Sequence, residues 1–342
     1  MRWMQKLSFV ALLCAIIAFG ASPGNAAVSV KAVGGFHIGG KEVIIKDMPV
    51  QVVQYTKNGP IEKVDPNGEF MAGQMYVHYV LLEKALSQYP LLLWHGGGLT
   101  GVTYEDTPDG RPGWQQFFLN AGHDVYNCDA VERGRASWAK YPEIYTTSPV
   151  FRPKGQTWLN FRFGTEYNED PAKRVAHPGQ QFPVEHLDQF TRQFVPRWTS
   201  TDGLIMAAYN ELIEKKFTGG CVVLAHSQGG GFAINAALAN PGKVKGLILV
   251  EPNGAPDPDK VDLSPIKDIP VLIVWGDYQN NPKITAWNKA AYGDLYPKFA
   301  KGLEAKNGKV TWIDLPELGI KGNTHMLMMD KNSDQVAQVI QD

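Results

Sequence analysis

The chain of 342 residues is poor in cysteine, with only three, and one of these, Cys14, lies in an apolar N-terminal run. The other two cannot build the disulfide framework on which small secreted domains depend. Cys128 ends one predicted parallel strand and Cys221 begins another, which places them at opposite edges of the sheet, too far apart to bridge. We therefore expect two buried free thiols and no thiol nucleophile.

The sequence also lacks an excess of positive or negative charge. Lysine and arginine number 33, aspartate and glutamate 34, and the net charge is −1. Because phosphate binding requires a basic surface, nucleic acid is not expected as a partner. The sequence shows no internal repeat, charge run or low-complexity tract, and no later apolar run approaches the length of a membrane span.

One apolar run is present, over residues 7–19. Basic residues precede it, and small residues follow at positions −3 and −1 of a cleavage point: Arg2, Lys6, Gly24 and Ala26. The run is too short for comfortable membrane spanning, so the pattern predicts a secretory signal peptide over residues 1–26. We expect an exported protein, secreted or periplasmic, with no membrane contact after cleavage.

Residues 27–342 are predicted to form a single α/β domain, because the chain is long and 44% hydrophobic. Residues 28–82 have the pattern of antiparallel strands joined by glycine-containing turns. From Pro90 onward, short apolar strands alternate with helices, which indicates a mostly parallel sheet wound on both faces. The predicted strands are 91–94, 124–128, 222–225, 244–250, 271–275 and 310–313, and the predicted helices are 113–121, 202–215, 230–240 and 284–304.

One segment between Asp129 and Thr201 interrupts this alternation. It is rich in proline, arginine and aromatic residues, and a structureless loop of that length is uncommon in a compact domain. We expect an inserted cap, about residues 130–200, over the carboxyl ends of the strands. Four of its aromatic residues are expected to be mainly core: Trp158, Phe161, Phe163 and Trp198. Five arginines are expected to pair with cap carboxylates more often than to bind substrate: Arg133, Arg135, Arg152, Arg162 and Arg197.

The most informative stretch is residues 221–231, where an apolar strand leads into a serine and three glycines. Ser227 has small residues two positions before and after it, Ala225 and Gly229. A sharp strand-to-helix turn requires them, because it brings their backbones together. This is the pattern of a nucleophile elbow, with alanine in place of the usual first glycine. A serine N-cap would give the same short match, but the strand before and the helical sequence after favour the elbow.

A serine hydroxyl is a weak nucleophile and needs a base, an orienting acid and an oxyanion hole. Residues 95–101 read His-Gly-Gly-Gly-Leu-Thr-Gly and follow the strand at 91–94 directly. Glycines there allow backbone N–H groups to approach a developing oxyanion. We expect the N–H groups of Gly97 and Gln228 to be the donors, with Gly98 as the next choice in the loop. A phosphate-binding turn is the alternative, but the Gly-Lys-Ser/Thr signature is missing.

The base should follow the last strand, in the chain order serine, acid, histidine, and His325 is the histidine that fits. The acid has two candidates. Three residues beyond Gly276, where it often lies, stands Gln279, which cannot ionise. Asp277 follows that glycine directly, where side chains often fix turns. Glu251 closes an apolar strand, where a carboxylate is costly unless it has a partner, and we favour it.

These motifs resemble those of the α/β-hydrolase superfamily and, more narrowly, of secreted bacterial carboxylesterases of the Alcaligenes esterase type. The matching residues span most of the mature chain: 95–96 with 99–101, 107–111, 113–114, 134–135, 194–197, 225–229, 250–252 and 324–326. The resemblance implies a Ser–Glu–His triad with its acid on the earlier strand, which points to Glu251. This sequence departs from the family pattern at Gly97 and Gly98. The typifying member has adjacent cysteines there, so its vicinal disulfide beside the oxyanion hole is absent from this chain.

We therefore expect an exported serine hydrolase that cleaves small carboxylic esters through an acyl-enzyme, without cofactor or metal. The alternatives are a binding protein that kept the scaffold without turnover, and a lactonase, thioesterase or acyltransferase on the same triad. An acid–histidine cluster is expected to be salt-bridged surface rather than a metal site: His177, Glu185, His186 and Asp188. A homodimer is left open.

Overall fold

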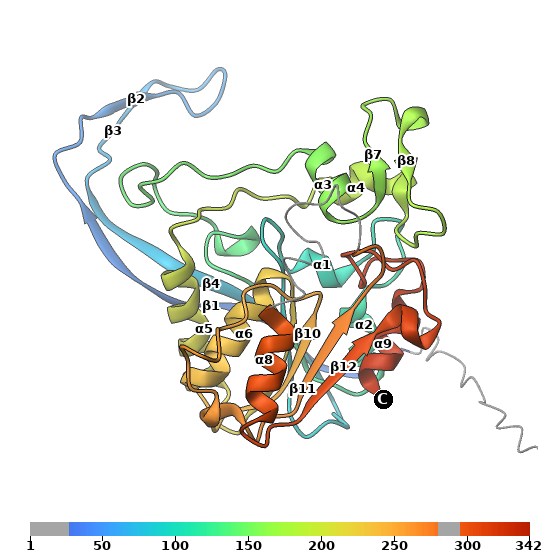
Figure 1. Ribbon diagram of the computed structural model, residues 1–342. Helices are drawn as coiled ribbons and strands as arrows, with labels where there is room; N and C mark the ends of the chain where they lie inside the picture. The colour runs from blue at the N-terminus through green and yellow to red at the C-terminus, as the bar shows by residue number, and fades with distance from the viewer. Residues whose placement is uncertain (1–26, 280–294) are drawn as a thin grey trace, which may run out of the picture.

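The computed structural model describes residues 27–279 and 295–342. The signal peptide predicted over residues 1–26, and the first part of the helix predicted over 284–304, lie outside the described residues. An eight-stranded sheet runs through the molecule in the order β1-β4-β6-β5-β9-β10-β11-β12 (Figure 1). The strands are β1 (Val30–Ile45), β4 (Gly68–Leu82), β5 (Leu91–Trp94), β6 (Val125–Asp129), β9 (Cys221–His226), β10 (Val244–Val250), β11 (Val271–Trp275) and β12 (Val310–Asp314).

The sheet is antiparallel at its N-terminal end and parallel elsewhere. Strand β4 pairs antiparallel with both β1 and β6. The pairs from β6 through β12 are all parallel. All the carboxyl ends of the parallel strands therefore meet at one edge, where the loops that carry chemistry gather. The α/β fold class predicted from the sequence is confirmed.

Helices cover both faces of the sheet (Figure 1). The described α-helices are α1 (Val102–Glu105), α2 (Trp114–Asn120), α3 (Lys154–Asn160), α4 (Leu187–Thr191), α5 (Asp202–Lys216), α6 (Gln228–Ala239), α8 (Leu295–Glu304) and α9 (Ser333–Gln341). Short 3-10 helices are η1 (Gly134–Ala136), η2 (Pro171–Lys173), η3 (Val184–His186), η4 (Ser264–Ile266) and η5 (Leu315–Leu318). One core lies under α5, α6 and α8, and a second under α2 and α9.

Strand β5 illustrates why the short apolar runs of the sequence form the central strands of the sheet. All four of its residues are buried, with Leu92 and Trp94 in one core and Leu91 and Leu93 in the other. Successive side chains of a strand point to opposite faces, so a strand covered on both sides has to be apolar throughout.

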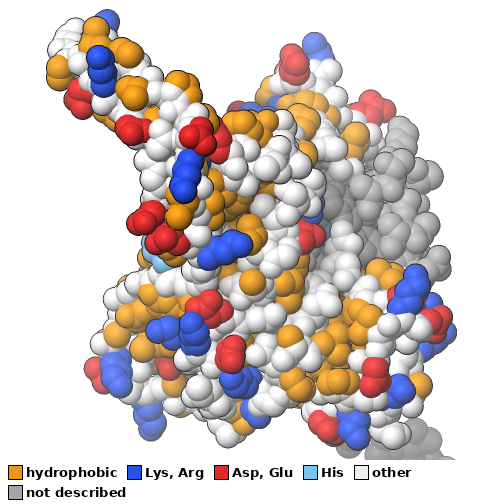
Figure 2. Space-filling view, turned by 90° about the vertical axis from the view of Figure 1, so that its left-hand side faces the viewer, with side chains coloured by type: hydrophobic (Ala, Val, Ile, Leu, Met, Phe, Trp, Pro, Cys, Tyr) orange, Lys and Arg blue, Asp and Glu red, His pale blue; other side chains and the backbone are white. Residues whose placement is uncertain are grey.

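Strands β1 and β4 form a long hairpin that extends beyond the sheet. Its far end continues into two short strands, β2 (Gln51–Val53) and β3 (Glu62–Val64), which pair with each other. This arm projects from the body of the molecule (Figures 1 and 2). It carries exposed apolar side chains: Val50, Val52, Tyr55 and Ile61.

The inserted segment, residues 130–200, lies over the carboxyl-end loops. It contains α3, α4 and a two-stranded sheet of β7 (Gly164–Glu166) and β8 (Val175–Ala176). Its backbone bonds to those loops, for example from the Val195 N–H to the Gly98 carbonyl at 3.1 Å and from the Gln181 N–H to the Gly322 carbonyl at 2.8 Å. The four aromatic side chains predicted as core are all buried.

The cysteines confirm the expectation of free thiols. Cys128 and Cys221 are buried and unbridged. Burial raises the pKa of the Cys128 thiol well above its ordinary value and that of Cys221 to about 12. Neither thiol ionises near neutral pH, so neither is a nucleophile. Among the described residues, no helix is long and apolar enough to cross a bilayer.

Candidate active site

Ser227 occupies the sharp turn between β9, which ends at His226, and α6, which begins at Gln228. Its φ of 51° and ψ of −121° lie in a region that non-glycine residues rarely adopt. Such strain is typical of a nucleophile elbow, where it raises the side chain above the sheet edge. The turn is tight, because a Cβ at Gly229 would stand 2.9 Å from the carbonyl oxygens of both Trp94 and His95.

This crowding predicts the effect of a single added methyl group. A Gly229→Ala variant is expected to lose about 1–3 kcal/mol of unfolding free energy, because both clashing atoms belong to the backbone and cannot rotate away. Gly203→Ala in α5 is the matched control, since no atom lies within 4 Å of its added Cβ. There the change should be neutral or stabilise by up to about 1 kcal/mol. Urea unfolding measures both, and equal stability of the two variants would contradict the tight elbow.

Three side chains form one line of hydrogen bonds at the carboxyl edge of the sheet. The Nε2 atom of His325 lies 3.1 Å from Oγ of Ser227, and its Nδ1 lies 3.1 Å from Oε2 of Glu251. Glu251 directly follows β10, and His325 lies in the loop between η5 and α9. The structure thus brings together the serine, histidine and glutamate that the sequence singled out.

Asp330 fixes the loop that carries His325. Its carboxylate accepts from the Thr324 N–H at 2.8 Å, the Thr324 hydroxyl at 2.7 Å and the Asn323 amide at 3.0 Å. Burial raises the pKa of Asp330 to about 7, against the opposing effect of these hydrogen bonds. Sequence reasoning missed this residue, because an aspartate just before a helix has the pattern of an ordinary start signal.

Glu251 is fully buried, and its two oxygens have different partners. Oε1 accepts from Nη2 of Arg162 at 2.6 Å and from the Gly276 N–H at 2.5 Å, which leaves Oε2 for His325. Burial alone would raise the pKa of this carboxyl. The charge of Arg162 and the hydrogen bond from His325 outweigh burial and lower the pKa to about 2. The carboxylate is therefore ionised throughout the neutral range.

His325 is also buried completely, and burial lowers the pKa of its imidazole. The Glu251 carboxylate opposes that shift, whereas the cations Arg162 and Arg152 add to it. The neutral imidazole donates from Nδ1 to Glu251 and leaves Nε2 to accept from the serine hydroxyl. His226 beside it donates from Nε2 to the His325 carbonyl at 2.8 Å, and burial holds its pKa well below the ordinary value.

Asp277, the alternative acid, has other partners. Its Oδ1 accepts from the Tyr278 N–H at 2.7 Å, and its Oδ2 accepts from the Gly322 N–H at 3.0 Å. Its own N–H donates to the Asn323 carbonyl at 2.7 Å. These bonds tie the turn after β11 to the histidine loop. Gln279, three residues beyond Gly276, donates to the Gly276 carbonyl at 3.4 Å.

The glycine loop after β5 lies beside the serine. A Cβ at Gly97 would stand 2.8 Å from the side-chain amide of Gln228, which shows how closely the two segments approach. Within the described part of the chain, the backbone N–H groups of Gly97, Gly98 and Gln228 donate to no protein acceptor. Free N–H groups next to a nucleophile are what an oxyanion hole requires.

Two buried side chains brace this glycine loop. His95 donates from Nδ1 to the Gly96 carbonyl at 2.8 Å and accepts at Nε2 from the Ala130 N–H at 3.1 Å. Burial lowers its pKa to about 4, so it remains neutral. Asp129, at the end of β6, accepts from the Gly101 N–H at 2.6 Å. The loop is thereby held at both ends.

The expectation for the arginines of the inserted segment needs a correction. Their ion pairs include Arg133 with Glu132, Arg135 with Glu105 and Asp129, and Arg162 with Glu251. Arg135 and Arg162 were expected to pair within the cap, but the partners of Arg135 precede the cap, and the partner of Arg162 is the buried Glu251. The sequence does indicate that Arg162 has a buried partner, because it stands between two phenylalanines and a cation in an apolar stretch needs such a partner.

The two carboxylates of the acid–histidine cluster form surface ion pairs as expected, whereas His177 is buried and stacks on the Tyr278 ring, with the ring centroids 4.5 Å apart. Asp188 pairs with Lys154 at 2.6 Å, and Glu185 pairs with Lys331 at 3.2 Å. A search of the described residues finds no group of three or more side chains placed to hold a metal ion.

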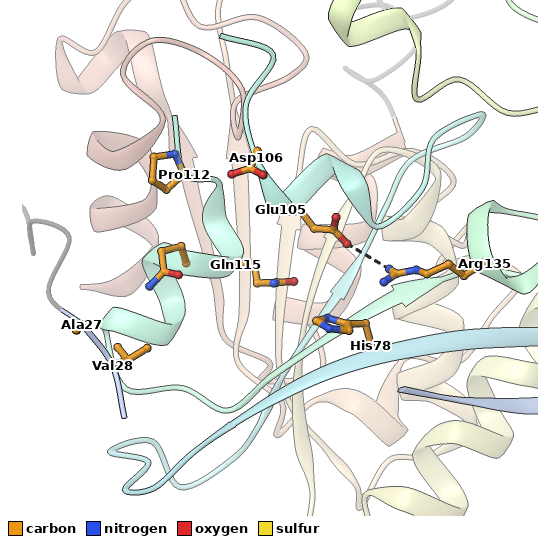
Figure 3. A pocket seen from close by; sticks show the side chains of 9 residues that line it. Ala27, Val28, His78, Glu105, Asp106, Pro112, Gln115 and Arg135 are labelled. Atoms are coloured by element: carbon orange, nitrogen blue, oxygen red, sulfur yellow. Dashed lines mark ion pairs between the residues drawn. The ribbon is translucent and has the colours of Figure 1, made fainter. Parts of the chain in front are cut away.

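A separate groove of about 800 Å³ lies beside α1 and η1 (Figure 3). Its lining includes His78, Glu105 and Arg135, and the last two form an ion pair at 3.3 Å. None of its lining residues belongs to the line of hydrogen bonds or to the glycine loop.

Known proteins similar to this chain include an esterase and a lipase. No protein-family model matches the chain. A solved structure described as that of a novel bacterial esterase is 31% identical, with a TM-score of 0.76, and the match covers 92% of this chain and 95% of the other. A curated protein of Fungal sp. (strain ATCC 74256), named "Probable secreted lipase phiG", is 26% identical over 328 residues, which cover 80% of this chain and 86% of that protein.

The fold and these relatives define a carboxylic ester hydrolase. The chain belongs to the α/β-hydrolase superfamily, in the same family as the bacterial esterase.

Proposed function

We propose that the protein is an exported serine esterase that uses Ser227, His325 and Glu251 as its triad. One observation carries the proposal: the His325 imidazole links Oγ of Ser227 to Oε2 of Glu251. The distances from Nε2 to Oγ and from Nδ1 to Oε2 are both 3.1 Å. The substrate class is a small carboxylic ester. Export is supported by the name of the fungal relative and by the pattern of residues 1–26.

In the acylation step, Ser227 attacks the ester carbonyl while His325 takes its proton at Nε2. The tetrahedral oxyanion is held by the N–H groups of Gly97 and Gln228, with Gly98 as the alternative donor of the loop. Glu251 stabilises the imidazolium that forms, and the imidazolium then protonates the leaving alcohol. A water activated by His325 releases the acid from the acyl-enzyme. The residues complete this cycle without a cofactor.

The test combines covalent labelling with turnover. A fluorophosphonate probe should label the purified protein at Ser227, because only an activated serine reacts quickly with it. A panel of p-nitrophenyl esters of rising chain length should be hydrolysed, with preincubated probe abolishing the activity. A binding protein on the same scaffold would bind ligands yet remain unlabelled, and that result would overturn the proposal. Product analysis with an added alcohol separates hydrolysis from acyl transfer.

The pH dependence follows from the base. His325 must be neutral to accept a proton, so kcat/KM should rise as the pH increases through its pKa. Because burial, Arg162 and Arg152 lower that pKa, the midpoint of the acid limb should lie below about 6.5, the ordinary value for histidine. Rates for p-nitrophenyl acetate from about pH 4 to about pH 9 measure this. A midpoint above the ordinary value would contradict the assigned environment of the base.

A further inference from the structure

Arg162 is a fully buried cation of the inserted segment that contacts the proposed triad acid. Its side chain has 0% exposure, and its Nη2 donates to Oε1 of Glu251 at 2.6 Å. Its Nε donates to the Asp277 carbonyl oxygen at 2.8 Å. One guanidinium therefore joins the inserted segment to the turns after both β10 and β11.

The backbone around Arg162 is held in an unusual conformation. Its φ is 62°, a left-handed value that costs free energy for a residue with a side chain. The preceding residue, Phe161, accepts at its carbonyl from the His325 N–H at 3.0 Å. The Phe161 ring centroid lies 5.0 Å from the His325 ring centroid. Two consecutive residues of the insertion thus contact the base and the acid.

A purely mechanical role explains this cation poorly. Burial of a guanidinium is costly, and an apolar residue of similar size fastens two segments at least as well. Within the described residues, Glu251 is the ion-pair partner of Arg162, while its Nη1 is buried without a hydrogen-bond partner. The guanidinium therefore forms its ion pair with Glu251, the acid in the line of hydrogen bonds.

We propose that Arg162 is a positioning residue that keeps Glu251 ionised and its Oε2 directed at Nδ1 of His325. This inference rests on the triad proposed above. With Oε1 occupied by the guanidinium and the Gly276 N–H, the carboxylate has only Oε2 to offer the imidazole. Without the cation, only His325 of these two partners would oppose the effect of burial, so the pKa of the Glu251 carboxyl would rise, and a protonated carboxyl cannot stabilise an imidazolium by charge.

Other charged groups face the same pair and have to be separated from Arg162. Arg152, which lies over the Phe161 ring at 5.2 Å, also lowers the pKa of His325. His226 is kept neutral by burial, and Asp330 on the histidine loop has a pKa raised by burial to about 7. The carboxylate of Asp277 bonds to backbone N–H groups and not to the imidazole.

Removal of the cation should move the acid limb of kcat/KM upward. Loss of a nearby positive charge makes the His325 imidazolium easier to form, and Glu251 then protonates at a higher pH. Both changes act in the same direction, and a unit charge at this range in a buried site corresponds to about one pH unit. Orientation is lost as well, so kcat should fall about 10- to 100-fold with little change in KM.

The experiment compares Arg162→Met, Arg162→Gln and Arg162→Lys in the full chain. Both neutral variants should show the upward shift, and the glutamine variant carries the test if the methionine variant does not fold. Arg162→Lys keeps the charge but loses the planar fork, so its acid limb should remain in place while kcat falls less than tenfold. Arg174→Met, which removes an arginine over the Trp158 ring in the same segment, is the control and should match the wild type.

An unchanged acid limb in the folded neutral variants would overturn the proposal, because a mechanical role alters stability and kcat without moving that limb. The neutral Arg162 variants are also compared with the arginine form in an Asp330→Asn background, which removes the other nearby carboxyl that titrates. The upward shift of the acid limb should persist in that background. Failure of the triad itself is distinguishable. In that case the wild type would not be labelled at Ser227 by the fluorophosphonate probe, whatever the Arg162 variants do.

Discussion

A Ser227→Ala variant is expected to lose about 10⁶-fold in kcat on p-nitrophenyl esters, the scale typical of removing a triad nucleophile. The reason is that the Ser227 hydroxyl is the group that lies 3.1 Å from the Nε2 atom of His325, where the base takes up its proton. Removing the hydroxyl also relieves little strain, because the backbone φ of 51° remains. The fold should therefore persist, and substrate binding, measured as protection against thermal unfolding, should survive.

The control for this variant is Ser200→Ala, which removes an exposed hydroxyl bonded to Thr147 in the inserted segment. That protein should hydrolyse esters at the wild-type rate and label fully with the fluorophosphonate probe. Residual turnover of Ser227→Ala at more than about 1% of the wild-type kcat would place the nucleophile elsewhere, since the oxyanion hole and binding alone supply far less.

Much of the sheet could be predicted because its central strands are short apolar runs. Residues such as Leu91–Trp94 are buried on both faces, and that requirement is written in the sequence. Strand β1 is less visible, since its glycines break the alternation of a half-buried strand. The structure gives the reason for two of them: a Cβ at Gly34 or Gly35 would lie within 2.5 Å of the hydroxyl groups of Tyr79 and Tyr76 on β4. Only the pairing partner reveals that need.

The candidate site likewise contains residues that the sequence predicts and one whose contact it does not. Ser227 follows from a local pattern, and His325 from chain order combined with a parallel sheet. Glu251 follows from the cost of a carboxylate at the end of an apolar strand. The two phenylalanines beside Arg162 indicate that it needs a buried partner, but its contact with Glu251 could not be predicted, because that contact depends on how the insertion folds back over the sheet.

The two acid candidates lead to the second large prediction. Glu251→Gln is expected to lower kcat about 10⁴-fold, since a neutral amide cannot stabilise the imidazolium. Asp277→Asn should lower it less than tenfold, because an amide oxygen can still accept one of its two backbone N–H groups. Steady-state kinetics on one ester at a fixed pH give the comparison. The reverse order of losses would transfer the role of the acid to Asp277.

Stability has to be separated from catalysis in this comparison, because Glu251→Gln leaves Arg162 as an unpaired buried cation. Breaking a buried ion pair on one side costs about 3–5 kcal/mol, whereas replacing both partners by neutral residues is often close to neutral. The double variant Glu251→Gln with Arg162→Met should therefore regain most of the thermal stability that the single variant loses. It should not regain kcat, since the carboxylate is still missing. Recovery of both together would mean that Glu251 serves the fold and that the imidazole takes its orientation from another group.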